Sequence, residues 1–411
     1  MAQQQIKKKK KKKRNRDTFI GRCKIRIVRF LMGKILPRYY DHYAKKPVDE
    51  DKVIFVESRY EKLSNNFELI YDRLSKDDSL NIKIHLLRHL FVGRLEHFRR
   101  CFALAKDAAT AKYIFICEGC RVTGKLNIRP ETTVFQVWHG CGLGKRFGFS
   151  CVNKEFGGNL EERRFSNIYK ADYASVSAPS IIPYFEEAFG KGENNPIEVL
   201  ALGMSRTDIY FDKERIAKAY DNLYAAVPEA RGKKVICYSP TFRGNPSEAS
   251  VPDLPDYCAM ADRFRDDYVL IVKYHPMIQS VPAIPDYCKG FAFDVSKTLS
   301  SDDAVMSSDI YINDYSSLMY DCSLMNRPQL FYAPDVDDYE DERGMYFDYE
   351  TSVPSKVLKT TDELIEAIEN IDNYDFDRLA EFREKYMSSC DGHSTDRIIA
   401  KMFGDRVIKG S

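Results

Sequence analysis

Polar side chains follow three apolar, β-branched runs in the second half of this 411-residue sequence. Runs of this length and composition are typical of buried parallel strands. Because the carboxyl ends of parallel strands lie along one edge of a sheet, we expect these side chains to face one crevice. Cationic groups, hydroxyls and a helix N-terminus together favour binding of a diphosphate. The three sets are Thr241 with Arg243 after KVICYS, Lys273 with His275 after YVLIVK, and Ser316 with Ser317 after IYI.

The third set lies in the stretch around which the chain is organised, residues 309–335. Its pattern predicts a strand, a polar turn, a helix and a second strand, with Pro328 ending the helix. Ser316 and Ser317 stand where this helix begins. Helix N-termini favour anions because their first N–H groups lack partners within the helix. We therefore expect the two serines to hold a phosphate.

A glycine-rich turn in the first half presents a histidine, His139, directly after the apolar run 133–138. The turn is not a P-loop, because the glycine spacing is short and Arg146 follows Lys145. It is not a dinucleotide fingerprint either, because Phe147 stands where a glycine is required. An isolated histidine is more often structural than catalytic, so the residues alone leave both roles open for His139.

The elements that would position these groups alternate between strands and helices, which predicts parallel sheets covered on both faces. A chain of this length exceeds one ordinary core, so we expect two Rossmann-type lobes with a cleft between them. A closing helix should return to the first lobe. The expected strands are 53–57, 82–86, 113–117, 133–138, 173–177, 198–201, 234–239, 268–273, 310–312 and 329–332, and the expected helices include 58–76 capped by Ser58, 93–109, 361–370, 376–387 and 394–403.

The charge is unevenly distributed although the net charge is only +2. Residues 1–46 carry a balance of +15 and the remainder −13. Residues 7–13 form a lysine run, and 19–40 predict a basic amphipathic helix that is too charged to span a bilayer. The favoured interpretation is a segment lying on an anionic membrane, because its apolar stripe needs a partner. Nucleic-acid binding and a merely solvated tail are the alternatives, and we expect no nucleic-acid partner.

The cysteines predict neither disulfides nor a metal site. Eleven are scattered along a chain with no apolar signal sequence, which favours reduced thiols in the cytosol. Cys117 and Cys120 form a C-x-x-C pair, but the second pair that a zinc site needs is missing. We expect no cofactor, with a loosely held Mg²⁺ ion as the alternative.

Taken together, the motifs resemble those of the CDP-glycerol glycerophosphotransferase family, whose members prime and polymerise teichoic acids in bacteria. The resemblance runs in order from about residue 134 to 400. Its pieces are Trp138-His139-Gly140, Gly203-Met204-Ser205-Arg206-Thr207-Asp208, Ser239-Pro240-Thr241-Phe242-Arg243, His275-Pro276, Asp314-Tyr315-Ser316-Ser317 with Asp321, Arg343-Gly344-Met345-Tyr346-Phe347-Asp348 and Asp391-Gly392-His393.

The resemblance implies a GT-B-like fold and a division of the chain. Residues 1–46 would be the membrane-associating segment, 47–205 the acceptor lobe, 206–390 the nucleotide-donor lobe and 391–411 a C-terminal helix packing back on the body. It also implies an enzyme on the cytoplasmic face of the membrane that moves glycerol phosphate from CDP-glycerol to a lipid-linked or polymeric acceptor.

The resemblance further assigns roles to single residues. His139 matches the general base toward the acceptor hydroxyl, and His275 a second essential histidine near the donor phosphates. The residues matching donor contacts are Trp138, Gly140, Cys141, Gly142, Arg206, Pro240, Thr241, Arg243, Lys273, Ser316, Ser317 and Asp321.

The sequence departs from the family pattern in three ways. Cys141 and Gly142 replace a Thr-Pro pair and Lys145 comes one position late, Lys273 replaces an arginine, which removes bidentate phosphate binding, and the chain is short, nearer in length to the primases than to the long polymerases. These departures leave the donor polyol, the acceptor and processivity open, with CDP-ribitol as an alternative to CDP-glycerol. A glycosyltransferase that uses a nucleotide sugar and a non-catalytic protein with a basic tail are the other hypotheses.

Overall fold

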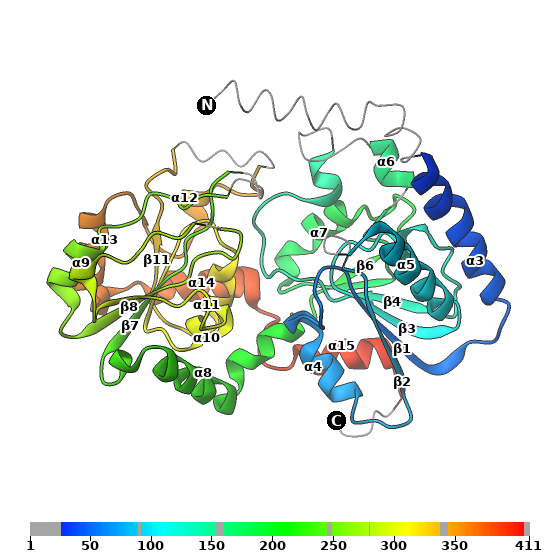
Figure 1. Cartoon of the computed structure of the whole chain (residues 1–411), viewed down its shortest axis with the longest axis horizontal. Helices are drawn as coiled ribbons and strands as arrows, with labels where there is room; N and C mark the ends of the chain where they lie inside the picture. The colour runs from blue at the N-terminus through cyan, green and yellow to red at the C-terminus, as the bar shows by residue number, and fades with distance from the viewer. Residues whose placement is uncertain are drawn as a thin grey trace.

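The computed structural model describes residues 26–88, 92–152, 160–165, 167–244, 249–278, 280–337 and 344–406. It confirms the predicted two-lobed α/β architecture (Figure 1). Within the described residues each lobe has one six-stranded parallel sheet, ordered β2-β1-β3-β4-β5-β6 in the first lobe and β12-β11-β10-β7-β8-β9 in the second.

The first sheet is buried on both faces, as a parallel sheet requires. Along its strand β1, Val53 and Phe55 belong to one core cluster and Ile54 and Val56 to another, because successive side chains point to opposite faces. Its elements are β1 (Asp49–Glu57), α4 (Asn65–Leu74), β2 (Asn81–Leu86), α5 (Arg94–Ala108), β3 (Ala111–Ile116), β4 (Thr133–Gln136), α6 (Leu160–Phe165), β5 (Tyr173–Ser175), α7 (Ile182–Phe189) and β6 (Glu198–Leu200).

The N-terminal helical segment differs from the separate segment 1–46 that the sequence predicts. Residues 26–30 are helical, Leu31–Ile35 form a π-helical turn, and α3 spans Leu36–Tyr43. Leu36 and Tyr40 are buried in the first-lobe core, because residues four apart share one helix face, and this face packs against α5. Part of the predicted membrane segment is therefore integral to the first lobe, whereas residues 1–25, which include the lysine run, lie outside the described residues.

The second lobe repeats the alternation around its own sheet. Its two shortest strands, β9 and β12, flank the sheet and were not predicted from the sequence. The elements are α8 (Lys213–Ala226), β7 (Lys234–Tyr238), α9 (Tyr257–Phe264), β8 (Tyr268–Val272), β9 (Ala292–Asp294), α10 (Ser301–Met306), β10 (Ile310–Asn313), α11 (Leu318–Ser323), β11 (Gln329–Tyr332), α12 (Tyr349–Ser352), β12 (Val357–Leu358), α13 (Thr361–Glu369) and α14 (Phe376–Met387).

The last helix, α15 (Ser394–Phe403), packs on the first lobe, beside α4 in Figure 1. The rings of Phe403 and Tyr113 lie 4.2 Å apart. The carboxylate of Asp208 accepts hydrogen bonds from the backbone N–H groups of Ser394 and Thr395, at 3.0 and 2.7 Å. The chain thus crosses between the lobes twice, and these hydrogen bonds join the first crossing, near Asp208, to the second, before α15.

The expected helix 58–76 begins later than predicted, and Ser58 is not its cap. Glu57 accepts hydrogen bonds from the backbone N–H groups of Arg59 and Tyr60, which turns the chain after β1, and α4 starts only after Ser64. Among the described residues we find no helix with the length and apolar character needed to cross a membrane.

Candidate active site

A cavity of about 440 Å³ lies between the two lobes. Both histidines singled out in the sequence line it, together with the glycine turn of the first lobe and the strand ends of the second. Of the predicted site residues, the structure brings together Trp138, His139, Gly140, Cys141, Gly142, Thr241, His275, Ser316 and Ser317. It places Arg206, Pro240, Arg243, Lys273 and Asp321 outside the lining of this cavity.

The turn after β4 is held in an unusual backbone conformation at Trp138, whose φ is +59°. A bulky residue adopts positive φ only when its surroundings compensate for the strain. Here the indole is buried against Phe147 and Phe189, at ring-centroid distances of 4.8 and 5.1 Å. The Trp138 N–H also donates to Gln136 Oε1 at 3.1 Å. Trp138 therefore anchors the turn that presents His139 to the cavity.

The hydrogen bond of His139 fixes which of its ring nitrogens carries the proton. Nδ1 lies 3.2 Å from the carbonyl oxygen of Cys117, which can only accept, so Nδ1 is the donor. In the neutral ring Nε2 then has a free electron pair. The side chain of His139 is exposed to the cavity, but the surrounding protein removes water from the ring and lowers its pKa to about 4. Arg59 and Arg206 act in the same direction, and the bond to Cys117 opposes them. The ring is therefore neutral at pH 7 and can accept a proton at Nε2.

His275 has the opposite arrangement. The backbone N–H of Met277 donates to His275 Nδ1 at 3.2 Å, so this nitrogen is an acceptor and Nε2 carries the proton in the neutral ring. Partial desolvation by the surrounding protein lowers the pKa of His275, Asp314 opposes this effect and Lys273 adds to it. His275 can thus donate a hydrogen bond to an oxygen in the cavity while remaining uncharged.

A buried carboxylate, Asp314, organises the strand ends of the second lobe. It accepts hydrogen bonds from the backbone N–H of Thr241 at 2.9 Å and from the Thr241 hydroxyl at 2.5 Å. Arg243 lies 3.0 Å from Asp314 and pairs with both carboxylate oxygens of Asp335, at 2.6 and 3.1 Å. The guanidinium of Arg243 and the hydroxyl proton of Thr241 are therefore engaged within the protein rather than directed at a ligand.

The two serines lie at the start of α11, as the sequence predicts, although this helix is only six residues long. Ser316 Oγ accepts a hydrogen bond from the N–H of Leu318 at 3.3 Å, and its carbonyl accepts one from the side chain of Asn313 at 3.0 Å. Both serines line the cavity. Their part in binding a phosphate stays a prediction.

Arg206 and Asp321, both predicted to contact the donor, form a buried ion pair. Arg206 Nη2 lies 2.8 Å from both carboxylate oxygens of Asp321. The thiol of Cys141 lies 3.3 Å from this guanidinium and 3.5 Å from the carboxylate. Because the three residues come from the lobe crossing, from α11 and from the first-lobe turn, this cluster connects the lobes beneath the cavity.

The two other residues outside the cavity lie in the second lobe. Lys273 donates from Nζ to the carbonyl of Ser296 at 2.8 Å, and burial lowers its pKa. Pro240 lies directly after β7. A donor-binding role for these residues stays a prediction.

The pairing of the first-lobe turn with residues 344–346 across the cleft was not predicted. Arg146 N–H donates to the carbonyl of Gly344 at 2.9 Å, and Tyr346 N–H donates to that of Gly144 at 3.0 Å. The Arg146 guanidinium lies 4.8 Å from the centre of the Tyr346 ring. The only available signal was the RGMYFD motif, whose Arg343 lies outside the described residues. Arg146 and its neighbour Lys145 line the cavity and supply positive charge there.

Gly142 is required where the first-lobe turn meets the second lobe. Its φ is +62°, and a Cβ at this position would lie 2.2 Å from the ring of Tyr320. The Gly142 N–H donates to Ser177 Oγ at 2.9 Å. Only glycine allows this close approach.

Within the described residues no group of three or more His, Cys, Asp or Glu side chains is arranged to hold a metal ion.

Comparisons with known proteins agree with these motifs. The model of the family described as CDP-Glycerol:Poly(glycerophosphate) glycerophosphotransferase matches residues 38–404. The chain is 33% identical over 378 residues to the teichoic acid ribitol-phosphate primase of Bacillus spizizenii, an alignment covering 90% of this chain and 96% of that protein. It is 31% identical over 283 residues to the teichoic acid glycerol-phosphate primase of Bacillus subtilis, covering 68% and 70% of the two chains.

Solved structures show the same fold. The wall teichoic acid polymerase TagF aligns with a TM-score of 0.70 and 21% identity, covering 93% of this chain and 97% of that structure. This likeness confirms the GT-B-like arrangement of the two lobes. Because the family model spans most of the sequence and the primases align over much of it, the chain belongs to the CDP-glycerol glycerophosphotransferase family of teichoic acid primases and polymerases.

Proposed function

We propose that the protein transfers a polyol phosphate from a CDP-linked donor to a hydroxyl of a lipid-linked or polymeric acceptor and releases CMP. The observation that carries this proposal is the pair of neutral histidines on one cavity with opposite proton positions. His139 offers a proton acceptor from the first lobe, and His275 offers a hydrogen-bond donor from the second.

The proposed step is a single displacement at the β-phosphorus of the donor. The acceptor oxygen forms a bond to this phosphorus while its proton passes to Nε2 of His139. The bond between the β-phosphorus and the bridging oxygen breaks, and CMP leaves with the electron pair. His275, Ser316 and Ser317 bind phosphate oxygens from the second lobe, while Lys145 and Arg146 offset the negative charge.

For the donor we propose CDP-glycerol, on the basis of the family model that matches this chain. A TagF variant whose solved structure includes CDPG, at 22% identity and a TM-score of 0.69, is consistent with this choice. CDP-ribitol is the second candidate, because the ribitol-phosphate primase aligns over more of this chain than the glycerol-phosphate primase does.

We also propose that the enzyme acts at the cytoplasmic face of the cell membrane, as a peripheral protein. A lipid-linked acceptor requires an enzyme that lies close to the membrane. The helical segment before α3 exposes Ile27 and Phe30, which are 58% and 55% exposed, next to Arg26 and Arg29. An apolar and basic helix surface is typical of proteins that lie on an anionic membrane.

The proposed reaction is tested by incubating the protein with CDP-glycerol, CDP-ribitol and a set of nucleotide sugars, each with a lipid-linked acceptor. We expect CMP from a CDP-polyol, and CDP-glycerol should be the better substrate. A higher rate with CDP-ribitol would correct the donor but keep the reaction. Release of a nucleoside diphosphate from a nucleotide sugar would instead identify a glycosyltransferase and contradict the proposal.

A further inference from the structure

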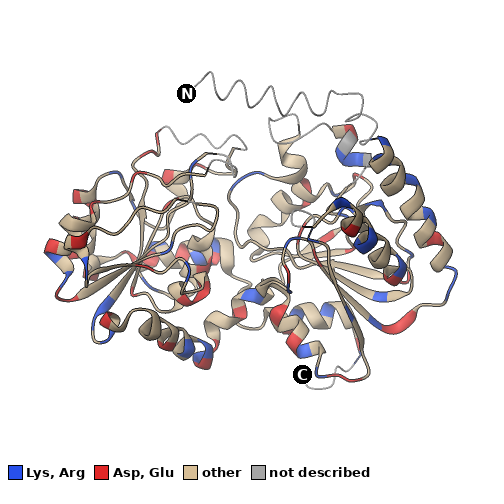
Figure 2. Ribbon diagram, viewed as in Figure 1, with Lys and Arg blue, Asp and Glu red and all other residues tan. Residues whose placement is uncertain are grey.

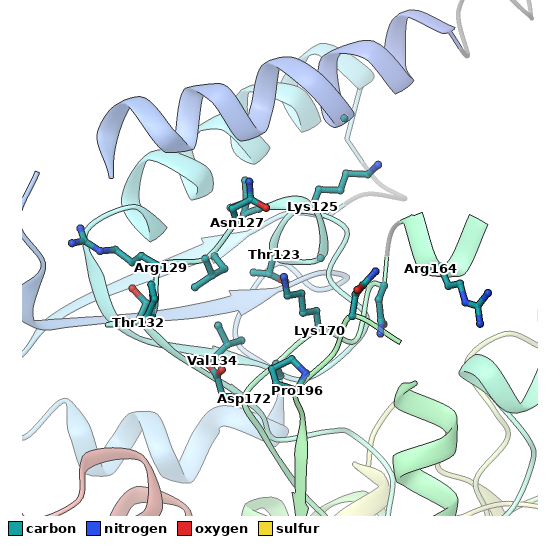
Figure 3. A pocket seen from close by; sticks show the side chains of 18 residues that line it. Thr123, Lys125, Asn127, Arg129, Thr132, Val134, Arg164, Lys170, Asp172 and Pro196 are labelled. Carbon is teal, nitrogen blue, oxygen red and sulfur yellow. Dashed lines mark hydrogen bonds between the residues drawn. The ribbon is translucent and has the colours of Figure 1, made fainter. Parts of the chain in front are cut away.

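A second cavity, of about 640 Å³, lies in the first lobe and shares no lining residue with the cleft cavity. It adjoins the starts of β4 and β5, near Val134 and Asp172 (Figure 3). His139 follows the other end of β4. The second cavity therefore lies toward the opposite edge of the sheet from the proposed transfer site, and its volume is within the range of about 300–1,000 Å³ typical of small-molecule sites.

The lining of this cavity has more cationic than anionic side chains. It includes four cationic side chains, Lys125, Arg129, Arg164 and Lys170, and one carboxylate, Asp172. The carboxylate accepts a hydrogen bond from the Val134 N–H at 2.7 Å. Two of the cations also have carboxylate partners, since Arg129 pairs with Glu131 and Arg164 with Glu193. Lys125 and Lys170 add positive charge from two different segments (Figure 3).

Further positive charge gathers around Lys125 where the loop meets the N-terminal helix. Burial lowers the pKa of Lys125, and the guanidinium groups of Arg121 and Arg29 lower it further. Figure 2 shows Lys and Arg along the upper part of the helix that leads into α3. Like charges held together repel one another, and an anion bound among them would relieve the repulsion.

The helical segment above the cavity has a local irregularity at this point. Gly33, which lines the cavity, lies within the π-helical turn Leu31–Ile35. Such single π turns inside α-helices are often found at functional sites. Glycine places no side chain over the cavity. One turn earlier, the segment that contributes Gly33 to the cavity also exposes the apolar side chains of Ile27, Val28 and Phe30.

We propose that this cavity binds the phosphate of an anionic phospholipid head group and so docks the first lobe on the membrane. The basic lining matches the phosphate, and the exposed apolar residues of the helix match the acyl region beside it. This inference rests on the proposed membrane contact but not on the proposed transfer reaction.

The test is co-sedimentation of the full chain with phosphatidylcholine vesicles that contain or lack phosphatidylglycerol. Wild-type protein should pellet preferentially with the anionic vesicles. Replacing both lysines, Lys125→Ala with Lys170→Ala, should weaken this binding by about 25-fold, since each cation near such a surface contributes about a fivefold effect. The conservative pair Lys125→Arg with Lys170→Arg should bind like the wild type.

The matched control removes the same charge elsewhere, by Lys76→Ala with Lys83→Ala. Lys76 follows α4 and Lys83 lies in β2, and both elements are at the lower edge of the lobe in Figure 1. Neither lysine lines the cavity. The control should keep nearly full binding. An equal loss in both pairs would overturn the site, because the attraction would then come from overall charge. Equally tight binding of inorganic phosphate, measured by calorimetry, would assign the cavity to a free anion instead of a lipid.

Activity separates this inference from the proposed reaction. With a soluble acceptor and no vesicles, the variant Lys125→Ala with Lys170→Ala should release CMP at the wild-type rate. A loss of CMP release in this variant would place the lysines in the transfer site and overturn the proposal. Absence of CMP release from the wild type itself would contradict the proposed reaction while leaving the vesicle result valid.

Discussion

The two walls of the cleft each contribute a histidine, and the two rings differ in one hydrogen bond. On the first-lobe wall, Nδ1 of His139 faces a carbonyl oxygen, that of Cys117. On the second-lobe wall, Nδ1 of His275 faces an N–H group, that of Met277. Desolvation by the surrounding protein lowers the pKa values of both rings, which favours their neutral forms at pH 7. The backbone groups behind the rings therefore distinguish a proton acceptor from a hydrogen-bond donor.

Removing the proton acceptor, His139, should have the largest effect. We expect His139→Ala to lower turnover by about 100- to 10,000-fold, the range typical of a general base, while donor affinity changes little. The measurement is CMP release under single-turnover conditions, together with calorimetry of donor binding.

The matched control is His275→Ala on the other wall. It should weaken donor binding by about 1–3 kcal/mol, because a hydrogen bond to a charged phosphate is lost. If His139→Ala impaired only binding and His275→Ala impaired only turnover, the roles of the two walls would be reversed.

A further variant removes the buried ion pair between Arg206 and Asp321, which connects the two lobes. Asp321→Ala leaves Arg206 as a buried charge without its carboxylate, which should lower the free energy of unfolding by about 3–5 kcal/mol. Chemical denaturation measures this loss. Replacing both partners with leucine should recover part of the stability, since no buried charge then remains.

The same variant tests the role that the family resemblance gives to Asp321. A stable Asp321→Ala protein with greatly weakened donor binding would show that the carboxylate contacts the donor and is not a connection between the lobes.

Much of the fold could be predicted because its signals are local. The helix 376–387 was predicted with its observed bounds, and its preceding residue, Asp375, accepts a hydrogen bond from the N–H of Arg378 as a helix cap. The strand 329–332 was likewise predicted by its apolar run after Pro328. The prediction that Ser58 caps the helix was wrong because the carboxylate of Glu57 accepts hydrogen bonds from the backbone after β1, so the helix starts only after Ser64.

The site could be predicted only in part, because several of its contacts join residues far apart in the chain. Residue types alone do not show that Arg206 pairs with Asp321, 115 residues away, rather than with a ligand. They also do not show that His139 meets a carbonyl 22 residues earlier. Motif order could identify the cavity residues, but only the tertiary structure reveals which polar atoms already form hydrogen bonds or ion pairs within the protein.

The central claim is tested most directly by ¹⁵N NMR of protein labelled at its seven histidines, with His139→Gln and His275→Gln used to assign the two signals. We predict the Nδ1–H form for His139 and the Nε2–H form for His275 at pH 7. Because desolvation by the surrounding protein disfavours the protonated ring, the His139 ring should stay neutral as the pH falls, and its signal should change only near its pKa of about 4. The same tautomer at both rings, or a His139 that titrates at the usual imidazole pKa of about 6.5, would contradict the account.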